Sequence, residues 1–325
     1  MKAIMIDAPG GSECITVRDL PVPQPKTGEV LIRVAFSPLN PLDIQARAGR
    51  IRWNHPGFPF VPGCAFAGRI VQLGEGVAAG LLDRRVTVAG CWGGNAEYAV
   101  APVTNVTPIP ERFSWTLGAV AAGTTRTAWH LLHSAARLRA GQTLVLHSAA
   151  GAVGTLTAQM ARTARARVIG LAGGPAKVAY ASRYVDQALD YNSGDWPGRV
   201  KELTGGTGAD VIIDGNSGPN AARNYEAVGN LGQIIYTGAM AGPAPEVSIP
   251  MLIGRSISVT GFVVTFHEAR DPLSGRAETE DRLARGEWLI PVQIIGELDD
   301  VAELHRRFEN RELCGRTLIR IGGEI

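Results

Sequence analysis

The sequence predicts an α/β protein with two domains, one rich in β-strands and one built on a doubly wound parallel sheet. Two observations support this prediction. The segment 143–154, TLVLHSAAGAVG, runs from strand residues into a turn of small residues, and residues 155–161 then read as a helix. Near residue 119, short strands divided by proline and glycine give way to alternating helices and strands, which is typical of a parallel sheet.

The turn after residue 146 has the spacing of a dinucleotide fingerprint, A-x-G-x-x-G, with alanine at the first glycine position. Small residues there let the backbone approach a pyrophosphate, whose charge lies on the amides at the helix N-terminus. A second apolar strand, 167–171, follows one helix later, which is the spacing of a βαβ unit. The alternative is an ordinary tight turn without a nucleotide. The expected cofactor contacts in the turn are Ala150, Gly151, Ala152, Val153 and Gly154.

The first part of the chain predicts a mostly antiparallel β domain. Its short apolar or alternating segments are divided by clusters such as PVPQPKTGE and NHPGFPFVPG. Two of its loops, 49–60 and 90–95, carry unusual aromatic and polar side chains. The expected strands are 1–6, 29–36, 68–73, 85–89 and 96–101.

The sequence after residue 119 predicts alternating helices and strands, followed by further helices and a last strand. Each strand of the parallel sheet ends in small or polar residues, and such carboxyl ends line the crevice of a nucleotide. The expected elements are a helix over 117–132, strands over 209–214, 233–238 and 256–264, helices over 277–286 and 299–309, an extended piece over 290–295 and a strand over 316–321.

Composition limits the classes of function. Apolar residues make up 45% of the 325 residues and charged residues 19%, so the chain is globular. The net charge of +2 and the lack of basic runs predict no nucleic-acid partner. Without an N-terminal signal or a long apolar span we expect no membrane association and a cytoplasmic location. The four cysteines are widely spaced and are expected to be reduced thiols.

Eight motifs occur in an order that resembles a known family. They are LNPLD at 39–43, VPG at 61–63 followed by FAG at 66–68, NAEY at 95–98, LRAGQT at 138–143, the AAGAVG turn, LDY at 189–191, LTGGTGAD at 203–210 and CGRT at 314–317. The whole chain resembles a medium-chain dehydrogenase/reductase of the zinc-independent quinone oxidoreductase branch. This resemblance implies a GroES-like catalytic domain at 1–118, completed by about 265–325, a Rossmann domain at 119–264, an active-site cleft between them, and often a dimer formed through the Rossmann sheets.

The resemblance also bears on metal binding. Zinc members of the superfamily hold a catalytic zinc ion with a cysteine, a histidine next to a glutamate and a further ligand. Here the matching positions read Asn40 and Gly63-Cys64-Ala65. Zinc needs three protein ligands even in an open site, so we expect no metal. Cys64 is interpreted as a buried filler, with a reactive thiol as the alternative.

The end of the second parallel strand indicates which nicotinamide cofactor binds. It reads LAGG at 171–174, without the carboxylate that binds the ribose hydroxyls of NAD. In the resembling family, the glycine, lysine and tyrosine matching Gly173, Lys177 and Tyr191 surround a 2′-phosphate, which predicts NADPH. Alternatively, Lys177 is a solvated helix residue without a role in binding. Arg311 is a second candidate for binding the phosphate. Further expected cofactor contacts are Thr127, which resembles a threonine at the carboxamide, and the strand-end residues Asn216, Gly238 and Phe262.

Candidate catalytic residues come from the same resemblance. Asn40 matches a residue near the nicotinamide, and Asp43 is expected to support its loop. Some relatives carry tyrosines where this chain has Gln45 and Ile51, so a tyrosine proton donor is not carried over. The expected substrate pocket is aromatic, with Trp53, Phe58, Phe60, Trp92, Asn95 and Phe266. Participation of Cys64, Arg126, His55 and His267 stays open.

Together these features predict an NADPH-dependent reductase that transfers hydride to a small apolar or conjugated acceptor, either a quinone or a conjugated C=C bond of an enone or enoyl substrate. Two alternatives remain. One is a pathway-specific reductase or reductive cyclase that acts on a large polyketide-like enone. The other is a non-catalytic NADPH-binding protein.

Overall fold

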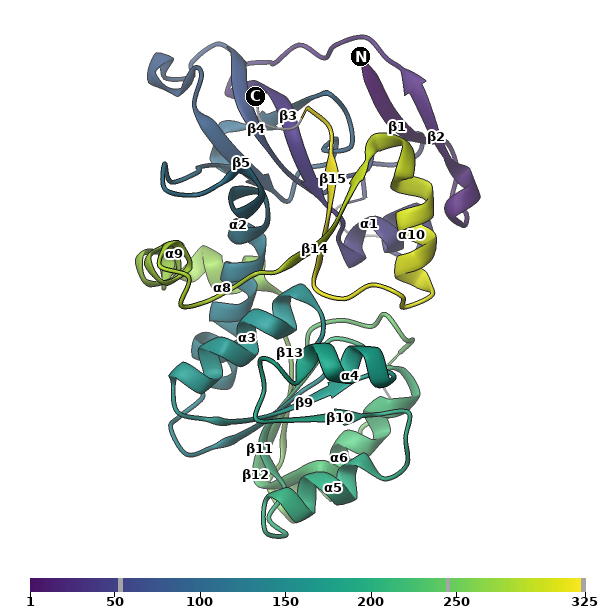
Figure 1. The fold of residues 1–325 in the computed structure, drawn as a ribbon, viewed down its shortest axis with the longest axis vertical. Helices are drawn as coiled ribbons and strands as arrows, with labels where there is room; N and C mark the ends of the chain where they lie inside the picture. The colour runs from purple at the N-terminus through teal and green to yellow at the C-terminus, as the bar shows by residue number, and fades with distance from the viewer. Residues whose placement is uncertain (52–54, 244–245, 323–325) are drawn as a thin grey trace. The chain divides into compact units, whose positions relative to one another are not determined.

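The computed structural model describes residues 1–51, 55–243 and 246–322. It divides into two compact units, Met1–Gly123 with Ile290–Ile325, and Thr124–Leu289 (Figure 1). Within the described ranges, no helix combines the length and the apolar character that a bilayer-spanning helix needs.

The first unit is built on a seven-stranded sheet in the order β14-β15-β3-β4-β5-β7, with β6 paired to β3. All its neighbours are antiparallel except β14 and β15. A separate antiparallel pair joins β1 and β2. The elements are β1 (Lys2–Ile6), η1 (Ser12–Cys14), β2 (Ile15–Asp19), β3 (Glu29–Pro38), α1 (Pro41–Arg47), β4 (Ala65–Leu73), η2 (Ala79–Leu81), β5 (Arg85–Ala89), β6 (Tyr98–Pro102), η3 (Val103–Asn105), β7 (Val106–Pro108), β14 (Val292–Glu297), η6 (Leu298–Asp300), α10 (Val301–Glu309) and β15 (Arg316–Arg320).

The core of this unit follows from strand alternation. Val30, Ile32 and Val34 of β3 are fully buried, and they pack with Phe66 and Ile70 of β4. Because side chains at alternate positions of a strand point to one face, these residues form one apolar layer. The antiparallel β domain predicted from the sequence is confirmed.

The second unit contains a six-stranded parallel sheet in the order β10-β9-β8-β11-β12-β13. The order reverses between β8 and β11, as in a doubly wound nucleotide-binding sheet, and the predicted fold class is confirmed. The elements are α2 (Trp115–His130), which begins in the first unit, η4 (Leu131–Ala136), β8 (Thr143–Leu146), α3 (Ala152–Thr163), β9 (Arg167–Ala172), α4 (Pro175–Ala181), β10 (Gln187–Asp190), α5 (Trp196–Leu203), β11 (Ala209–Asp214), η5 (Gly218–Arg223), α6 (Asn224–Ala227), β12 (Val228–Tyr236), α7 (Ile249–Arg255), β13 (Ser258–Gly261), α8 (Val264–Arg270) and α9 (Arg276–Ala284).

Residues 265–289 group with the second unit, whereas the sequence predicts that they complete the first domain. Trp129 of α2 explains the grouping, because its Nε1 donates to Ser274 Oγ at 3.1 Å. Gly275 lies against the same indole, where an added Cβ would come within 2.0 Å of a ring atom. The domain boundaries at 118/119 and 264/265 stay a prediction. The expected strand 256–264 is shorter than predicted, because β13 ends at Gly261 and a helix begins at Val264.

Candidate functional site

The fingerprint turn joins β8 to α3 through close backbone contacts. Ser148 adopts a left-handed conformation with φ of 53°, and its carbonyl accepts from the Gly151 amide at 2.8 Å. At Gly154 an added Cβ would lie 2.3 Å from the Ser148 carbonyl oxygen. Only glycine therefore lets α3 start this near to the turn. The first amides of α3 carry the positive end of the helix dipole, which suits a phosphate.

The end of β9 forms a second small-residue turn next to β10. A Cβ added at Gly173 would lie 2.5 Å from the Tyr191 Oη, so the phenol covers this glycine directly. Gly174 has φ of 86° and donates its amide to Asp190 Oδ1 at 3.0 Å. Lys177 follows one turn later on α4 and is half-buried. The structure thus places these three sequence-predicted residues, Gly173, Lys177 and Tyr191, at one corner of the carboxyl edge.

Asp190 holds the turn at this corner, a role that the sequence analysis missed. Its Oδ1 accepts from the amides of Gly174 and Asn192, at 3.0 and 2.9 Å. It therefore holds the β9–α4 turn and the end of β10 in one arrangement. The signal in the sequence was the aspartate that ends a strand within the LDY motif.

The ends of β11 and β12 are organised around a buried carboxylate. Asp214 is fully buried, and its Oδ1 accepts from the amides of Asn216 and Ser217, at 2.8 and 2.9 Å. Ser217 Oγ donates to the Gly238 carbonyl at 2.8 Å. Two expected cofactor residues, Asn216 and Gly238, consequently lie side by side at the carboxyl edge.

A polar chain continues behind this carboxylate. Asn224 Nδ2 donates to Asp214 Oδ2 at 2.8 Å, and Asn224 Oδ1 lies 2.7 Å from Nε2 of His147. Because the amide oxygen accepts, His147 carries its proton on Nε2. Burial lowers the pKa of His147, so the ring is neutral. The sequence does not predict this polar chain, because the two partners of His147 lie far along the sequence.

Phe262 follows β13 and is buried, with its ring stacked on His267 at 4.9 Å between centroids. His267 lies on α8, where Phe266 points outward and is 75% exposed. The guanidinium of Arg126 donates to both carboxylate oxygens of Glu268. This ion pair engages the side chain of Arg126, whose participation the sequence left open. Thr127, on the next position of α2, is half-buried.

In the first unit, the predicted catalytic residues begin α1. Asn40 and Asp43 form a capping box, in which the backbone amide of Asn40 donates to Asp43 Oδ2 at 2.9 Å. The other carboxylate oxygen accepts from the amides of Gly63 and Cys64, at 3.1 and 2.9 Å. Burial raises the pKa of Asp43, and these amides oppose that change. Asp43 therefore ties the start of α1 to the loop before β4.

Cys64 lies against this carboxylate and is buried. Burial and the neighbouring Asp43 raise the pKa of the Cys64 thiol well above its ordinary value. A protonated thiol is a poor nucleophile and a poor metal ligand. Across the parts of the chain that the structure describes, no three His, Cys, Asp or Glu side chains gather in a way that could hold a metal ion.

Three of the aromatic residues expected to line a pocket form an edge-to-face cluster in the first unit. Phe60 is buried, and its ring centroid lies 5.3 Å from Phe58 and 5.5 Å from Trp92. His55 joins them, and both its ring nitrogens contact backbone groups, Ala46 O at 3.1 Å and Gly57 N at 2.9 Å. Asn95 is 1% exposed, and its Oδ1 has no hydrogen-bond partner within the described residues. Trp53 lies outside the described residues. Arg311 is exposed in this unit, ahead of β15.

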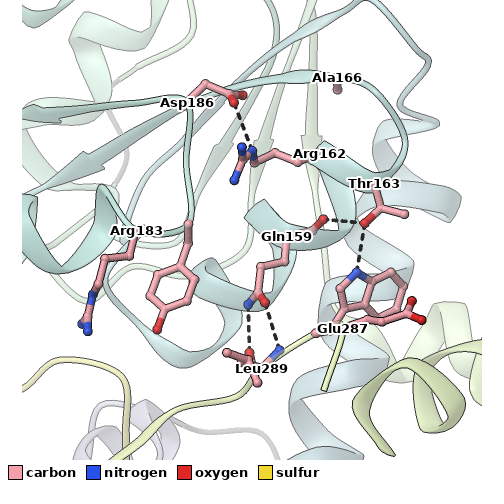
Figure 2. Close-up of a pocket in the computed structure, with 10 residues that line it drawn as sticks. Gln159, Arg162, Thr163, Ala166, Arg183, Asp186, Glu287 and Leu289 are labelled. Carbon is pink, nitrogen blue, oxygen red and sulfur yellow. Dashed lines mark hydrogen bonds and ion pairs between the residues drawn. The ribbon is translucent and has the colours of Figure 1, made fainter. Parts of the chain in front are cut away.

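A hollow of about 580 Å³ in the second unit lies away from the predicted cofactor edge (Figure 2). Ala166 and Asp186, which line it, directly precede β9 and β10, so it lies at the amino ends of these strands. Its polar groups pair with one another: Arg162 with Asp186 at 3.0 Å, Trp288 Nε1 with Thr163 Oγ1 at 3.0 Å, and the Gln159 amide with the backbone of Leu289.

Comparisons with known proteins match both units. The family described as "Alcohol dehydrogenase GroES-like domain" matches residues 26–111, and the family described as "Zinc-binding dehydrogenase" matches residues 152–276. A quinone oxidoreductase of Rattus norvegicus is 31% identical over 244 residues, which cover 73% of each chain. A quinone oxidoreductase of Homo sapiens is 28% identical over 311 residues, 94% of this chain and 93% of the relative.

Solved structures agree in fold over nearly the whole chain. A mycobacterial protein complexed with NADPH has a TM-score of 0.91 at 28% identity, and the alignment covers 98% of this chain and 100% of that one. A quinone oxidoreductase of Pseudomonas syringae pv. Tomato DC3000 has a TM-score of 0.90 at 27% identity, with 98% and 99% covered.

Proposed function

The chain belongs to the quinone oxidoreductase family of the medium-chain dehydrogenases/reductases, and on this premise we propose that it reduces a quinone or a conjugated C=C bond with NADPH, without zinc. As a member of this family it is an NADPH-dependent oxidoreductase. The acceptor class and the independence from zinc are the proposed parts.

The observation that carries the proposal is the cradle of small residues along the carboxyl edge of the parallel sheet. A Cβ at Gly154 would collide with the Ser148 carbonyl, and one at Gly173 would collide with Tyr191. Such close packing of strand, turn and helix is what a dinucleotide-binding turn needs so that its backbone can approach the phosphates. Lys177 would meet the 2′-phosphate, because an ammonium attracts that charge.

NADPH supplies a hydride when it is bound. The residues of this chain bind and orient it: the amides of α3 would hold the pyrophosphate, Gly173, Lys177 and Tyr191 the adenosine phosphate, and Asn216 and Gly238 the nicotinamide half of the edge. On a conjugated acceptor, the charge that develops moves to a carbonyl oxygen, so a hydrogen-bond donor can stabilise it.

The donor set supports independence from zinc. The positions that hold the metal in zinc relatives are an amide, Asn40, and a buried thiol, Cys64, whose pKa is raised. Zinc requires deprotonated sulfur or neutral nitrogen from three protein ligands. Activity should therefore persist in a strong chelator. Loss of activity that zinc restores would contradict this part of the proposal.

We also propose a homodimer through the edge of the parallel sheet. β13 is one of the two outer strands of the sheet, and an unpaired strand edge is a template for a second copy. α7, which leads into β13, exposes Ile249 and Ile253, by 59% and 74%. Pairing of two β13 strands would cover both the edge and these side chains.

Two alternatives give distinct results in one assay. Purified protein is mixed with NADPH and a small quinone, a small enone or an extended polyenone, and the nicotinamide absorbance is followed. NADPH binding with turnover only of extended polyenones would favour a pathway-specific reductase. Tight NADPH binding without turnover of any acceptor would favour the non-catalytic role.

A further inference from the structure

The side-chain amide of Asn40 is held between two groups that fix which way it faces. Its Oδ1 accepts from Arg316 Nη2 at 2.8 Å, and its Nδ2 donates to the Pro38 carbonyl at 2.8 Å. A guanidinium has only donors, and a carbonyl oxygen only accepts. The amide therefore cannot be turned over without losing both hydrogen bonds.

Arg316 is buried, and its side chain is held at this contact by hydrogen bonds. It is the first residue of β15 and is 9% exposed, and its Nη1 also donates to the Leu39 carbonyl at 3.4 Å. Burial lowers the pKa of Arg316 to about 10, while Cys64 and Asp43 oppose this, so the side chain stays charged at neutral pH. Among the described residues, Asn40 is the one side chain to which Arg316 donates a hydrogen bond.

This arrangement determines the direction of the second N–H bond of the Asn40 side chain. The Nδ2 group has two N–H bonds, and one is directed to Pro38. The other has no protein acceptor within the described residues, and Asn40 is only half-buried. Because the guanidinium withdraws electron density from Oδ1, the amide becomes a stronger donor at Nδ2. The residue thus presents an N–H, and not a carbonyl oxygen, beyond the start of α1.

We propose that Arg316 is a positioning residue that locks Asn40 as a hydrogen-bond donor to the carbonyl oxygen of the hydride acceptor. This inference rests on the proposed reductase function. The acceptor takes up a hydride from NADPH, which is thereby oxidised, and the electron pair displaced from the conjugated bond moves to the carbonyl oxygen. The Asn40 N–H binds this oxygen without being transferred, and a proton from water completes the reduction.

Asn40→Asp tests the direction of the amide with little change of shape. Aspartate can still cap α1 and accept from Arg316, but as a carboxylate it cannot donate. We expect kcat with a quinone or an enone to fall about 100-fold, as when one oxyanion donor is removed. The Kd for NADPH, measured by its fluorescence, should stay within about twofold, since the changed group faces the acceptor. Unchanged kcat in Asn40→Asp would overturn the proposal.

Arg316→Met and Arg316→Lys test the positioning role. Methionine leaves the amide free to rotate, and kcat should fall about 10-fold. Lysine keeps a charged donor and should recover part of this loss. Arg320→Met, on the same strand, is the matched control, because Arg320 is exposed and pairs at the surface with Glu297 at 3.4 Å. Equal kcat in Arg316→Met and Arg320→Met would overturn the proposal, as would a crystal structure of Arg316→Met with the amide unmoved and kcat reduced.

The wild-type assay separates this inference from the proposed function. If the wild-type protein binds NADPH but reduces no acceptor, the proposed function fails before any variant is compared. If the wild type reduces an acceptor and the Asn40 and Arg316 variants do so equally well, the function stands and the positioning role is wrong.

Discussion

The phenolic oxygen of Tyr191 lies so close to Gly173 that a Cβ at residue 173 would come within 2.5 Å of it. The two residues directly follow neighbouring strands of the parallel sheet, β9 and β10. The phenol can take this place only as long as residue 173 has no side chain. The position of the Tyr191 ring therefore depends on glycine at residue 173.

Gly173→Ala should weaken NADPH binding, because the new methyl group displaces the Tyr191 ring from the predicted phosphate corner. We expect the KM for NADPH to rise about tenfold, or ~1.4 kcal/mol, with a smaller change in kcat. Steady-state kinetics with a fixed acceptor measure both. Gly80→Ala is the control, since a Cβ there meets nothing within 4 Å. An unchanged KM in Gly173→Ala would place the phosphate elsewhere.

Lys177→Ala should change the choice between NADPH and NADH. Removing the ammonium takes away its attraction for the 2′-phosphate, so kcat/KM with NADPH should fall about 10- to 100-fold, as for a hydrogen bond to a charged group. The value with NADH, which lacks this phosphate, should change less than about twofold. Parallel loss with both cofactors would show that Lys177 acts on the fold and not on the phosphate.

The fingerprint turn shows what the sequence could predict. Its spacing is local, so the turn, α3 and β9 follow from about 30 residues read in order. Gly154 is explained by one contact with Ser148, six residues away in the chain. The doubly wound parallel sheet and its carboxyl edge could be expected from the alternation of helices and strands along the chain.

Long-range polar contacts could not be predicted in this way. Asn40 and Arg316 are 276 residues apart, and nothing in the CGRT motif tells which group its arginine reaches. The same holds for His147 and Asn224, 77 residues apart. The helix α8 was missed because the apolar run continues past Gly261, and this run reads as strand.

His305 predicts a dependence of stability on pH. It is fully buried, and neither ring nitrogen has a hydrogen-bond partner within the described residues. Burial, and then the charge of the neighbouring Arg47, lower the pKa of His305 from 6.5 to about 3. Glu309 also faces this region, paired with Arg47 at 2.6 Å.

The sign follows from proton binding. Because the unfolded chain takes up the proton near pH 6.5 and the folded protein only near pH 3, the free energy of unfolding falls as the pH drops between these values. His305→Leu should remove this contribution, so its melting temperature should fall less than that of the wild type between pH 7.5 and pH 5 in calorimetry. Equal falls in the two proteins would show that His305 is not protonated on unfolding.

Ile253→Glu tests the proposed dimer. The side chain is 74% exposed, so a charge there should not affect folding of the chain but should oppose burial against a second copy. Sedimentation velocity should show a dimer for the wild type and a monomer for the variant. Leu273→Glu, at a residue that is 69% exposed outside α7 and β13, is the control and should stay dimeric. A monomeric wild type would contradict the dimer.

The most direct measurement compares the oxidation of NADPH and NADH by the purified protein, with a quinone and with an α,β-unsaturated ketone, in the presence of a chelator. The predicted result is rapid oxidation of NADPH with at least one acceptor, much slower oxidation of NADH, and no effect of the chelator. A preference for NADH, or activity that the chelator removes, would contradict the proposed zinc-independent NADPH reductase.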